Sequence, residues 1–134
     1  MSEQRRRPRK TSGRPTAGEL AILQVLWELG ECTVRQVHET LNPDGTNSYT
    51  TTLKLMQIMF EKRLVVRDDS ERAHRYSAVA SRQHEQQAFV AELAQRLFNN
   101  SPTRLALQAL GQTGSIDKDE LQSIKALIER MEKE

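Results

Sequence analysis

The stretch TVRQVHETLNPDGTNSYTTTLKLMQIM, residues 33–59, decides the fold of this chain. Its first part is a short helix pattern, opened by the capping box of Thr33 and Gln36 and continued by apolar side chains at helical spacing, Val34, Val37 and Leu41. A cluster of turn residues, Asn42-Pro43-Asp44-Gly45, then ends it. Ser48 can cap a second helix that runs to about Arg63. The stretch therefore predicts two short helices that meet at an angle.

The second of these helices has two different faces. The residues that recur at helical spacing on its inward face are Thr52, Leu55, Met56 and Met59. The opposite face carries the polar side chains Thr50, Thr51, Lys54, Gln57 and Glu61. A run of threonines lowers helix propensity, because β-branched side chains lose rotamer freedom in a helix. This cost favours a function for the polar face.

The elements on either side of this stretch complete a recognisable domain. Thr16 and Glu19 form a capping box for an earlier helix that should end near Gly30. Residues 64–67 and 74–79 have the pattern of short strands around a charged turn. Three helices followed by a hairpin are typical of the winged helix-turn-helix, in which the helix after the turn enters the DNA major groove. We therefore expect a mainly α fold, with a winged helix-turn-helix domain over residues 16–80.

Residues 81–134 contain only helix patterns. We expect a long helix from Ser81, a short one capped by Ser101, and a final one opened by Asp117. Two clusters of helix breakers, 99–102 and 111–114, separate the three helices. Helices that total about fifty residues bury too little surface to form an independent core. Their apolar side chains consequently need a partner.

A symmetric homodimer is the partner that we expect, since dimers of this symmetry are the commonest soluble oligomers. The side chains predicted to form the dimer interface are Leu93, Leu97, Leu121, Ile124, Leu127, Ile128 and Met131. The alternative is that the three helices pack back on the winged domain. Residues 81–134 are thus expected to be a helical dimerisation region that follows the DNA-binding domain.

Length and composition exclude several classes of protein. The chain has 134 residues, 37% hydrophobic and 28% charged, which suits one soluble domain, or one small domain with an oligomerisation appendage. No run approaches the ~20 apolar residues of a membrane span, and the basic N-terminus has no apolar segment behind it, as a secretory signal would have. We expect a cytoplasmic protein with no membrane insertion.

The positive charge is concentrated at the N-terminus. Residues 1–15 hold six Lys or Arg against one Glu, for a charge of +5, whereas residues 16–80 carry −2 and residues 81–134 carry −1. Such a run should be disordered in the free protein. We interpret it as an arm that binds phosphates without sequence preference, with a solubilising tail as the alternative. The cations of the arm are Arg5, Arg6, Arg7, Arg9, Lys10 and Arg14.

Motifs of catalysis and metal binding are absent from the sequence. There is no P-loop, no Gly-x-Gly-x-x-Gly, no His-Glu-x-x-His and no Gly-x-Ser-x-Gly. His38, His74 and His84 are far apart in the sequence, and Cys32 is the single cysteine. We therefore expect neither an enzyme nor a metal or cofactor site.

The predicted surface suits double-stranded DNA. Threonine can offer a methyl to thymine and a hydroxyl to a base edge, lysine can reach guanine or phosphate, and glutamine can read adenine. The residues expected to face the major groove are Ser48, Tyr49, Thr50, Thr51, Lys54 and Gln57. Arg72 and Arg75 of the hairpin should contact the phosphate backbone, where they position the protein rather than read sequence.

Four segments together resemble the penicillinase-repressor family of bacterial transcription regulators. They are residues 20–27, LAILQVLW; 33–41, TVRQVHETL; 49–59, YTTTLKLMQIM; and the hairpin end at 72–76, RAHRY. The resemblance covers residues 16–80 by motif and 81–134 by helix layout. It implies a winged-helix homodimer that binds an inverted-repeat operator and represses transcription, in the β-lactam-resistance type with relief by a membrane sensor protease.

The sequence departs from the family in three places. It lacks the cysteine-rich C-terminal motif of the copper-responsive branch. Arg63 stands where the family usually has a glycine in a left-handed cap, at a cost of roughly 1 kcal/mol. The Asn-Phe pair that the family's protease cuts is replaced by Gln108-Ala109, which makes this bond only a candidate cleavage site. Proteolysis, an unknown co-repressor and constitutive repression all stay open.

A function of another class is also compatible with the sequence. A winged helix can serve as a protein-protein interaction module, using the same core and binding a protein through its third helix or its hairpin. The charge of −2 over residues 16–80 is the feature that favours this alternative. The two functions can be distinguished by experiment, because the affinity of a DNA-binding protein for DNA falls steeply as the salt concentration rises.

Overall fold

The computed structural model describes residues 14–134; the predicted arm residues before Arg14 lie outside this range. The helices are α2 (Ala17–Leu29), α3 (Val34–Leu41), α4 (Tyr49–Glu61), α5 (Arg82–Leu97), α6 (Pro102–Gly111) and α7 (Lys118–Glu132), and the strands are β1 (Cys32–Thr33), β2 (Val65–Asp68) and β3 (Arg75–Ala78). The chain divides into two compact units, one that ends at Phe89 and one from Val90 to Glu134.

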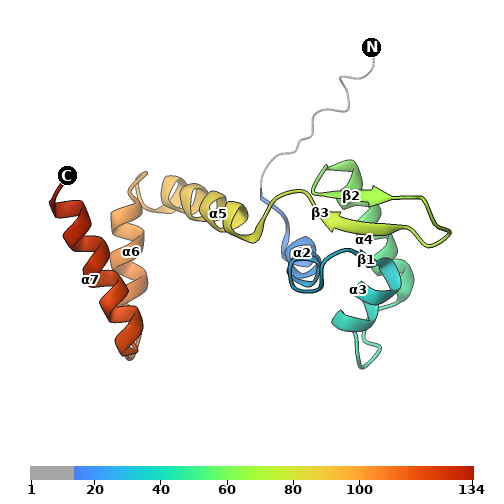
Figure 1. Ribbon diagram of the computed structural model, residues 1–134, viewed down its shortest axis with the longest axis horizontal. Coiled ribbons are helices and arrows are strands. Elements are labelled where there is room, and N and C mark those ends of the chain that lie inside the picture. The colour runs from blue at the N-terminus through green and yellow to red at the C-terminus, as the bar shows by residue number, and fades with distance from the viewer. Residues whose placement is uncertain (1–13) are drawn as a thin grey trace, which may run out of the picture. The chain divides into compact units, whose positions relative to one another are not determined.

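The first unit is a winged helix (Figure 1). Helices α2, α3 and α4 pack against one another and against a small antiparallel sheet whose strand order is β1-β3-β2. Strands β2 and β3 form the predicted hairpin, with Val65 opposite Ala78 and Asp68 opposite Arg75. The prediction of a winged helix-turn-helix in a mainly α chain is confirmed.

The sheet corrects one detail of the prediction, which had two strands where the structure has three. Strand β1 pairs Cys32 with Tyr76 and Thr33 with Arg75. A strand of two residues is too short to show an alternating pattern, and its partner lies more than forty residues further along the chain. Only the folded chain brings the two together.

Local capping explains where the first helices begin. Both predicted capping boxes are present: the Thr16 hydroxyl accepts from the Glu19 amide at 3.2 Å, and the Thr33 hydroxyl accepts from the Gln36 amide at 3.2 Å. Gly30 closes α2 with φ +83°, a conformation that side chains disfavour, while its amide donates to the Leu26 carbonyl.

The core lies between the three helices and the sheet. Val37, Met56 and Met59 have no exposed surface. The other buried members are Ile22, Leu23, Val25, Leu26, Cys32, Val34, Val65 and Tyr76. The inward face predicted for α4 is therefore correct, and its burial in this core holds the opposite face outward.

An ion pair between the buried Glu19 and the partly exposed Lys62 connects two helices of this unit. Glu19 is 1% exposed; one of its carboxylate oxygens accepts from the Thr16 amide at 2.9 Å and the other from Lys62 Nζ at 2.7 Å. Burial raises the pKa of Glu19, but the hydrogen bonds from Lys62 and Thr16 lower it further, so that the pKa lies below the usual glutamate value. The start of α2 is thus joined to the end of α4.

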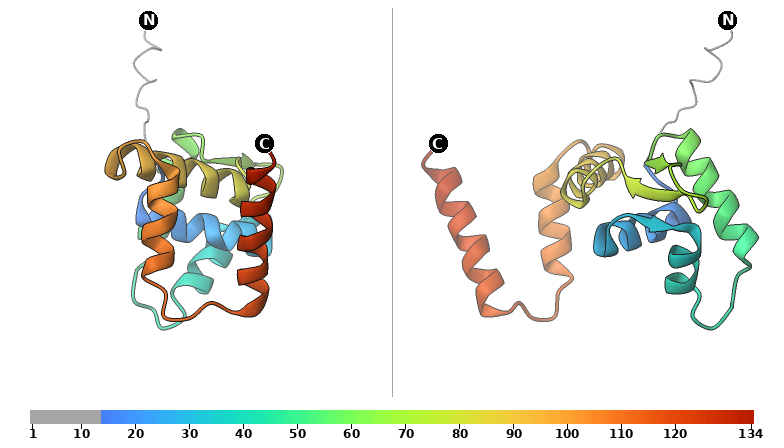
Figure 2. Two further views of the ribbon diagram at one scale, coloured as in Figure 1. Left: turned by 90° about the vertical axis from the view of Figure 1, so that its left-hand side faces the viewer. Right: turned by 45° about the vertical axis from the view of Figure 1, so that its right-hand side comes forward.

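The second unit has little internal packing. Figure 2 shows α6 and α7 joined at one end and diverging toward the other, and neither helix has a buried side chain. Asn99 and Asn100, both with positive φ, turn the chain after α5, and the Ser101 hydroxyl caps α6 as predicted. No helix in residues 14–134 combines the length and hydrophobicity that a membrane crossing requires.

Candidate nucleic-acid interface

Helix α4 presents a continuous polar face to solvent. Every residue predicted to read DNA is exposed: Ser48, Tyr49, Thr50, Thr51, Lys54 and Gln57. Thr52, directly after two of them, is instead buried, as are Met56 and Met59. The helix therefore separates its threonines, with two available for contact and one used for packing.

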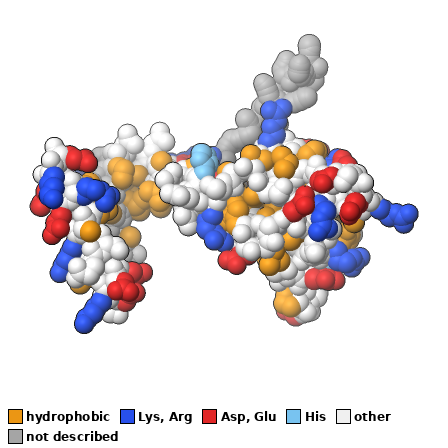
Figure 3. All heavy atoms as spheres, in the orientation of Figure 1, with side chains coloured by type: hydrophobic (Ala, Val, Ile, Leu, Met, Phe, Trp, Pro, Cys, Tyr) orange, Lys and Arg blue, Asp and Glu red, His pale blue; other side chains and the backbone are white. Residues whose placement is uncertain are grey.

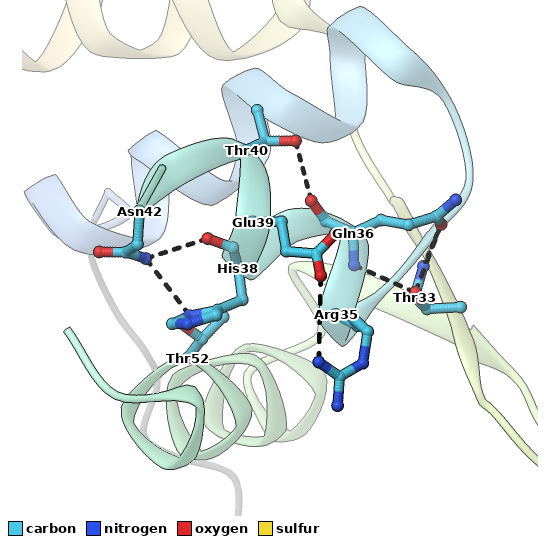
Figure 4. Close-up of polar contacts among 8 residues, drawn as sticks. All are labelled: Thr33, Arg35, Gln36, His38, Glu39, Thr40, Asn42 and Thr52. Carbon is cyan, nitrogen blue, oxygen red and sulfur yellow. Dashed lines mark hydrogen bonds and ion pairs between the residues drawn. The ribbon is translucent and has the colours of Figure 1, made fainter. Parts of the chain in front are cut away.

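Thr52 is held by a polar contact between α3 and α4. A hydrogen bond of 2.8 Å joins Thr52 Oγ1 and His38 Nδ1, and Asn42 Nδ2 lies 3.3 Å from the same ring nitrogen. The His38 ring also meets the Tyr49 ring edge to face, with 5.8 Å between centroids. Figure 4 shows His38 reaching from α3 to Thr52. This contact, which sequence reasoning missed, fixes the two helices of the helix-turn-helix against each other.

The turn before α4 is fixed by side-chain hydrogen bonds. The Asn42 amide donates to the His38 carbonyl, and its oxygen accepts from the Asn47 backbone amide at 3.3 Å. The Ser48 hydroxyl accepts from the Thr51 amide at 3.2 Å and lies 3.0 Å from the Thr51 hydroxyl. Ser48 is thus the predicted helix cap, and its hydroxyl is engaged by Thr51 within the chain.

The hairpin, which we call the wing, has its own ion pairs. Arg67 Nε donates to Asp69 Oδ1 at 2.8 Å, and His74 Nδ1 lies 3.4 Å from the same oxygen. The Arg67 guanidinium also stacks on the Phe60 ring at 4.3 Å. The Asp69 carboxylate therefore contacts both Arg67 and His74 and links the two strands of the wing near its tip.

The two arginines predicted to contact phosphate differ in their surroundings. Arg75 Nε is 3.7 Å from a carboxylate oxygen of Glu31, before β1. Arg72 is exposed at the wing tip and has no ion-pair partner among residues 14–134. Three carboxylates, Asp68, Asp69 and Glu71, lie close to it in sequence. Arg72 is therefore the more available of the two cations, in a tip that is not itself strongly basic.

A groove of about 430 Å³ connects the polar face of α4 with the wing. Helix α3 contributes Arg35, α4 contributes Tyr49 and Gln57, and the wing contributes Arg67, Arg72 and His74. The fold brings these residues together from three elements. Sequence reasoning missed Arg35, since nothing in a solvated helix position signals a neighbour more than thirty residues away.

The other predicted binding residues lie elsewhere. Arg14, the one cation of the predicted arm that lies among the described residues, forms an ion pair with Glu85 at 3.0 Å. Most of the predicted interface side chains are exposed, from Leu121 at 37% to Leu97 at 72%, and Ile124 is half-buried. Figure 3 shows hydrophobic side chains gathered over the junction of α5 and α6. Gln108 and Ala109 are exposed in α6.

Cys32 is buried and makes no disulfide. Burial raises the pKa of its thiol, against a smaller lowering by Arg75. Across residues 14–134, no three side chains of the metal-ligating types stand close enough together to hold an ion.

Comparisons with known proteins agree with this architecture. A family model described as penicillinase repressor matches residues 15–130. Two curated relatives, each a transcriptional regulator BlaI from a strain of Mycobacterium tuberculosis, CDC 1551 / Oshkosh and ATCC 25618 / H37Rv, are 42% identical over 65 residues. The match covers 48% of this chain and 47% of theirs, so the chain spans about half the length of the curated relatives it matches.

A solved structure is also similar. The crystal structure of a MarR family transcriptional regulator from Silicibacter pomeroyi DSS aligns over 86% of this chain and 67% of its own, with 23% identity and a TM-score of 0.39.

Proposed function

The chain belongs to the penicillinase repressor family, and from this premise we propose that it is a DNA-binding transcriptional repressor that binds an inverted-repeat operator as a homodimer. The observation that carries the proposal is the polar face of α4, exposed along its length and backed by a buried core. A helix of this kind, placed after a tight turn and beside a wing, has the form that enters a major groove. Acting on the bacterial chromosome, the protein would work in the cytoplasm.

Roles on DNA follow from side-chain chemistry. Thr50 and Thr51 offer methyl and hydroxyl groups, Lys54 an ammonium for guanine or phosphate, and Gln57 an amide suited to adenine. Tyr49 and the cap Ser48 would lie at the start of the reading helix. Arg72 would contact phosphate from the wing tip, and Arg75 would do so once released from Glu31. The N-terminal arm would add contacts to phosphates of any sequence.

The homodimer is supported by the apolar side chains that the second unit leaves exposed. Neither α6 nor α7 has a buried side chain. Large apolar side chains of α7 are therefore exposed to solvent: Leu127 is 46% exposed, Ile128 50% and Met131 61%. Contiguous apolar surface of this kind marks an interaction site. A second copy would cover it and would place two reading helices on two half-sites of the operator.

Relief of repression of the β-lactam-resistance type would act on α6. Cleavage between Gln108 and Ala109 by a membrane sensor protease would separate α7 from the DNA-binding unit and end the avidity of the dimer. A fragment of residues 1–108 should then appear on immunoblots when the target genes are induced. Intact repressor in fully induced cells would refute cleavage, and a co-repressor or constitutive repression would then be the mechanism.

A protein-protein interaction module is the second candidate. The feature that favours it is the wing tip, where Asp68, Asp69 and Glu71 lie close to Arg72 in sequence, because such a tip would approach a protein surface more readily than a duplex backbone. A module of this kind would show no affinity for DNA that depends on salt.

The test is a fluorescence titration with an operator fragment, recovered by pulling down genomic DNA, and with a random duplex, each at two salt concentrations. Binding should weaken steeply with salt. Thr51→Ala should cost roughly 1–3 kcal/mol on the operator and little on random DNA. Thr103→Ala, an exposed threonine of α6, is the matched control. Equal losses on both DNAs would assign Thr51 to backbone contact, and absence of binding would refute the proposal.

A further inference from the structure

We propose that the groove between α3, α4 and the wing is a phosphate-binding site centred on Arg35 and Arg72, open to a free phosphate group as well as to a phosphate of the DNA backbone. The site itself rests on the geometry of the groove. Its competition with DNA rests on the proposed function, because Tyr49 and Gln57 belong both to the groove and to the face proposed to read DNA.

The first argument is that two guanidinium groups in the groove have N–H donors that no close ion pair occupies. Arg35 lies over the Tyr49 ring at 5.1 Å, and its ion pair with Glu39 is long, at 3.9 Å, with both side chains about two-thirds exposed. Figure 4 shows Arg35 extending from α3, and the one contact drawn for it there is the ion pair with Glu39. Arg72 has no ion-pair partner among residues 14–134. Exposed pairs of this kind contribute little and are easily exchanged.

The second argument is that the other polar side chains of the wing hold one another in place. Arg67 and His74 share one oxygen of Asp69, at 2.8 and 3.4 Å, and Arg67 is further fixed on Phe60. These contacts hold the wall that the wing contributes. The residues that line the groove include three arginines and no carboxylate. Glu39 pairs with Arg35 and Asp69 with Arg67, which leaves Arg72 as the lining arginine without an ion pair among residues 14–134.

The third argument concerns size and chemistry. A volume of about 430 Å³ falls in the range of small-ligand sites, roughly 300–1,000 Å³, and leaves room for a phosphate with a small group attached. Guanidinium groups match phosphate oxygens in pairs, and arginine is the preferred residue for this recognition. Gln57 and Tyr49 add neutral polar groups at the wall. The chemistry that the groove recognises is therefore a phosphate.

The site can be tested without DNA. The full chain is titrated with inorganic phosphate at constant ionic strength, with chloride as the balancing anion, and amide signals of Arg35, Tyr49 and Ala73 are followed by NMR. We expect saturable shifts confined to the groove. Arg35→Gln or Arg72→Gln should weaken phosphate binding about tenfold, as removal of one charge-assisted contact does. The matched control is Arg104→Gln, an exposed arginine of α6, which should change nothing.

The spectra also report whether each variant remains folded. Shifts that do not saturate, or that are the same in Arg35→Gln and in the control, would overturn the free-phosphate site.

A second measurement identifies the source of the phosphate. Affinity for a random duplex is compared in phosphate and in chloride at equal ionic strength. We expect severalfold weaker binding in phosphate, a difference that Arg35→Gln abolishes. If phosphate binds the groove but DNA affinity is equal in both buffers, competition is refuted and the site serves a free ligand. If free phosphate does not bind but Arg35→Gln weakens DNA binding about tenfold, the backbone is the sole source.

The two proposals can fail separately. A chain that binds no DNA but shows the Arg35-dependent phosphate shifts would refute the repressor function and keep the site.

Discussion

The winged unit and the C-terminal unit keep their apolar side chains in opposite places. In the winged unit, Val37, Met56 and Met59 have no exposed surface. In α6 and α7 no side chain is buried, and Leu107 and Met131 are more than 60% exposed. Burial of one such side chain contributes about 1.5–3 kcal/mol to the free energy of folding, and the first unit gains this stabilisation within one chain. Helices α6 and α7 leave these side chains exposed, so hydrophobic periodicity predicts an apolar face but not what covers it.

The largest test of this difference is Ile124→Asp, which places a charge in the half-buried centre of the α7 stripe. We expect monomers by sedimentation and a loss of operator affinity of about 10²–10⁴-fold, because one reading helix no longer holds the other near its half-site. Ser123→Asp adds the same charge to an exposed position on the same helix and should remain a dimer. A dimer after Ile124→Asp would mean that the stripe is not the interface.

The second test compares two methionines. Met56→Ala removes a fully buried side chain from the winged unit and should lower the free energy of unfolding by about 2–5 kcal/mol. Met131→Ala, at a position 61% exposed, should have little effect on a dilute monomer and a growing effect as protein concentration rises. Thermal unfolding at two concentrations measures both. If Met131→Ala lowered the free energy of unfolding equally at both protein concentrations, Met131 would belong to a core within one chain.

The third test concerns the ion pair of Glu19 and Lys62. Lys62→Met leaves a buried carboxylate without its cation and should cost about 1–3 kcal/mol, less than a fully buried pair because Lys62 is partly exposed. Arg96→Met, which removes a pair in α5 between the exposed Arg96 and the partly buried Glu92, is the control and should cost at most about 0.5 kcal/mol. Chemical denaturation at neutral pH measures both.

The same pair should shape the response to acid. Because the folded-state pKa of Glu19 is lowered, the stability it contributes is fully present above the unfolded value, about 4.3, and is lost as pH falls through the folded value. In Lys62→Met, burial dominates, so the acid-unfolding midpoint should move to higher pH. A midpoint that stays unchanged would show that Lys62 does not hold this carboxylate ionised.

The smallest expected effect is at Arg63. Its φ of +68° is left-handed, and the next amide, Leu64, donates to the Met59 carbonyl at 2.9 Å, which directs the chain from α4 into β2. Arg63→Gly should raise the stability of the winged unit by about 0.5–1 kcal/mol. Denaturation of this variant measures the gain. A loss of stability would mean that the Arg63 side chain makes a compensating contact.

Short-range signals were enough to predict the helices of both units. The capping boxes at Thr16 and Thr33 each join residues three apart, and the turn at Asn99 and Asn100 uses side chains that tolerate positive φ. The inward face of α4 follows from the spacing of Met56 and Met59 alone. In each of these cases the interacting groups are neighbours along the chain, so their geometry is already contained in the order of residues.

Long-range placement was decided by the tertiary structure. Strand β1 exists because Cys32 meets Tyr76, Glu19 is ionised in the core because Lys62 reaches it, and Arg35 enters a groove whose far wall is the wing. The members of each pair are separated by about forty residues in the sequence. Considered alone, either member could equally be a side chain exposed to solvent. The sequence by itself determined which helices form and which of their faces are apolar. The tertiary structure decided which charged side chains come into contact, because ion pairs and hydrogen bonds depend on distances that the order of residues does not contain.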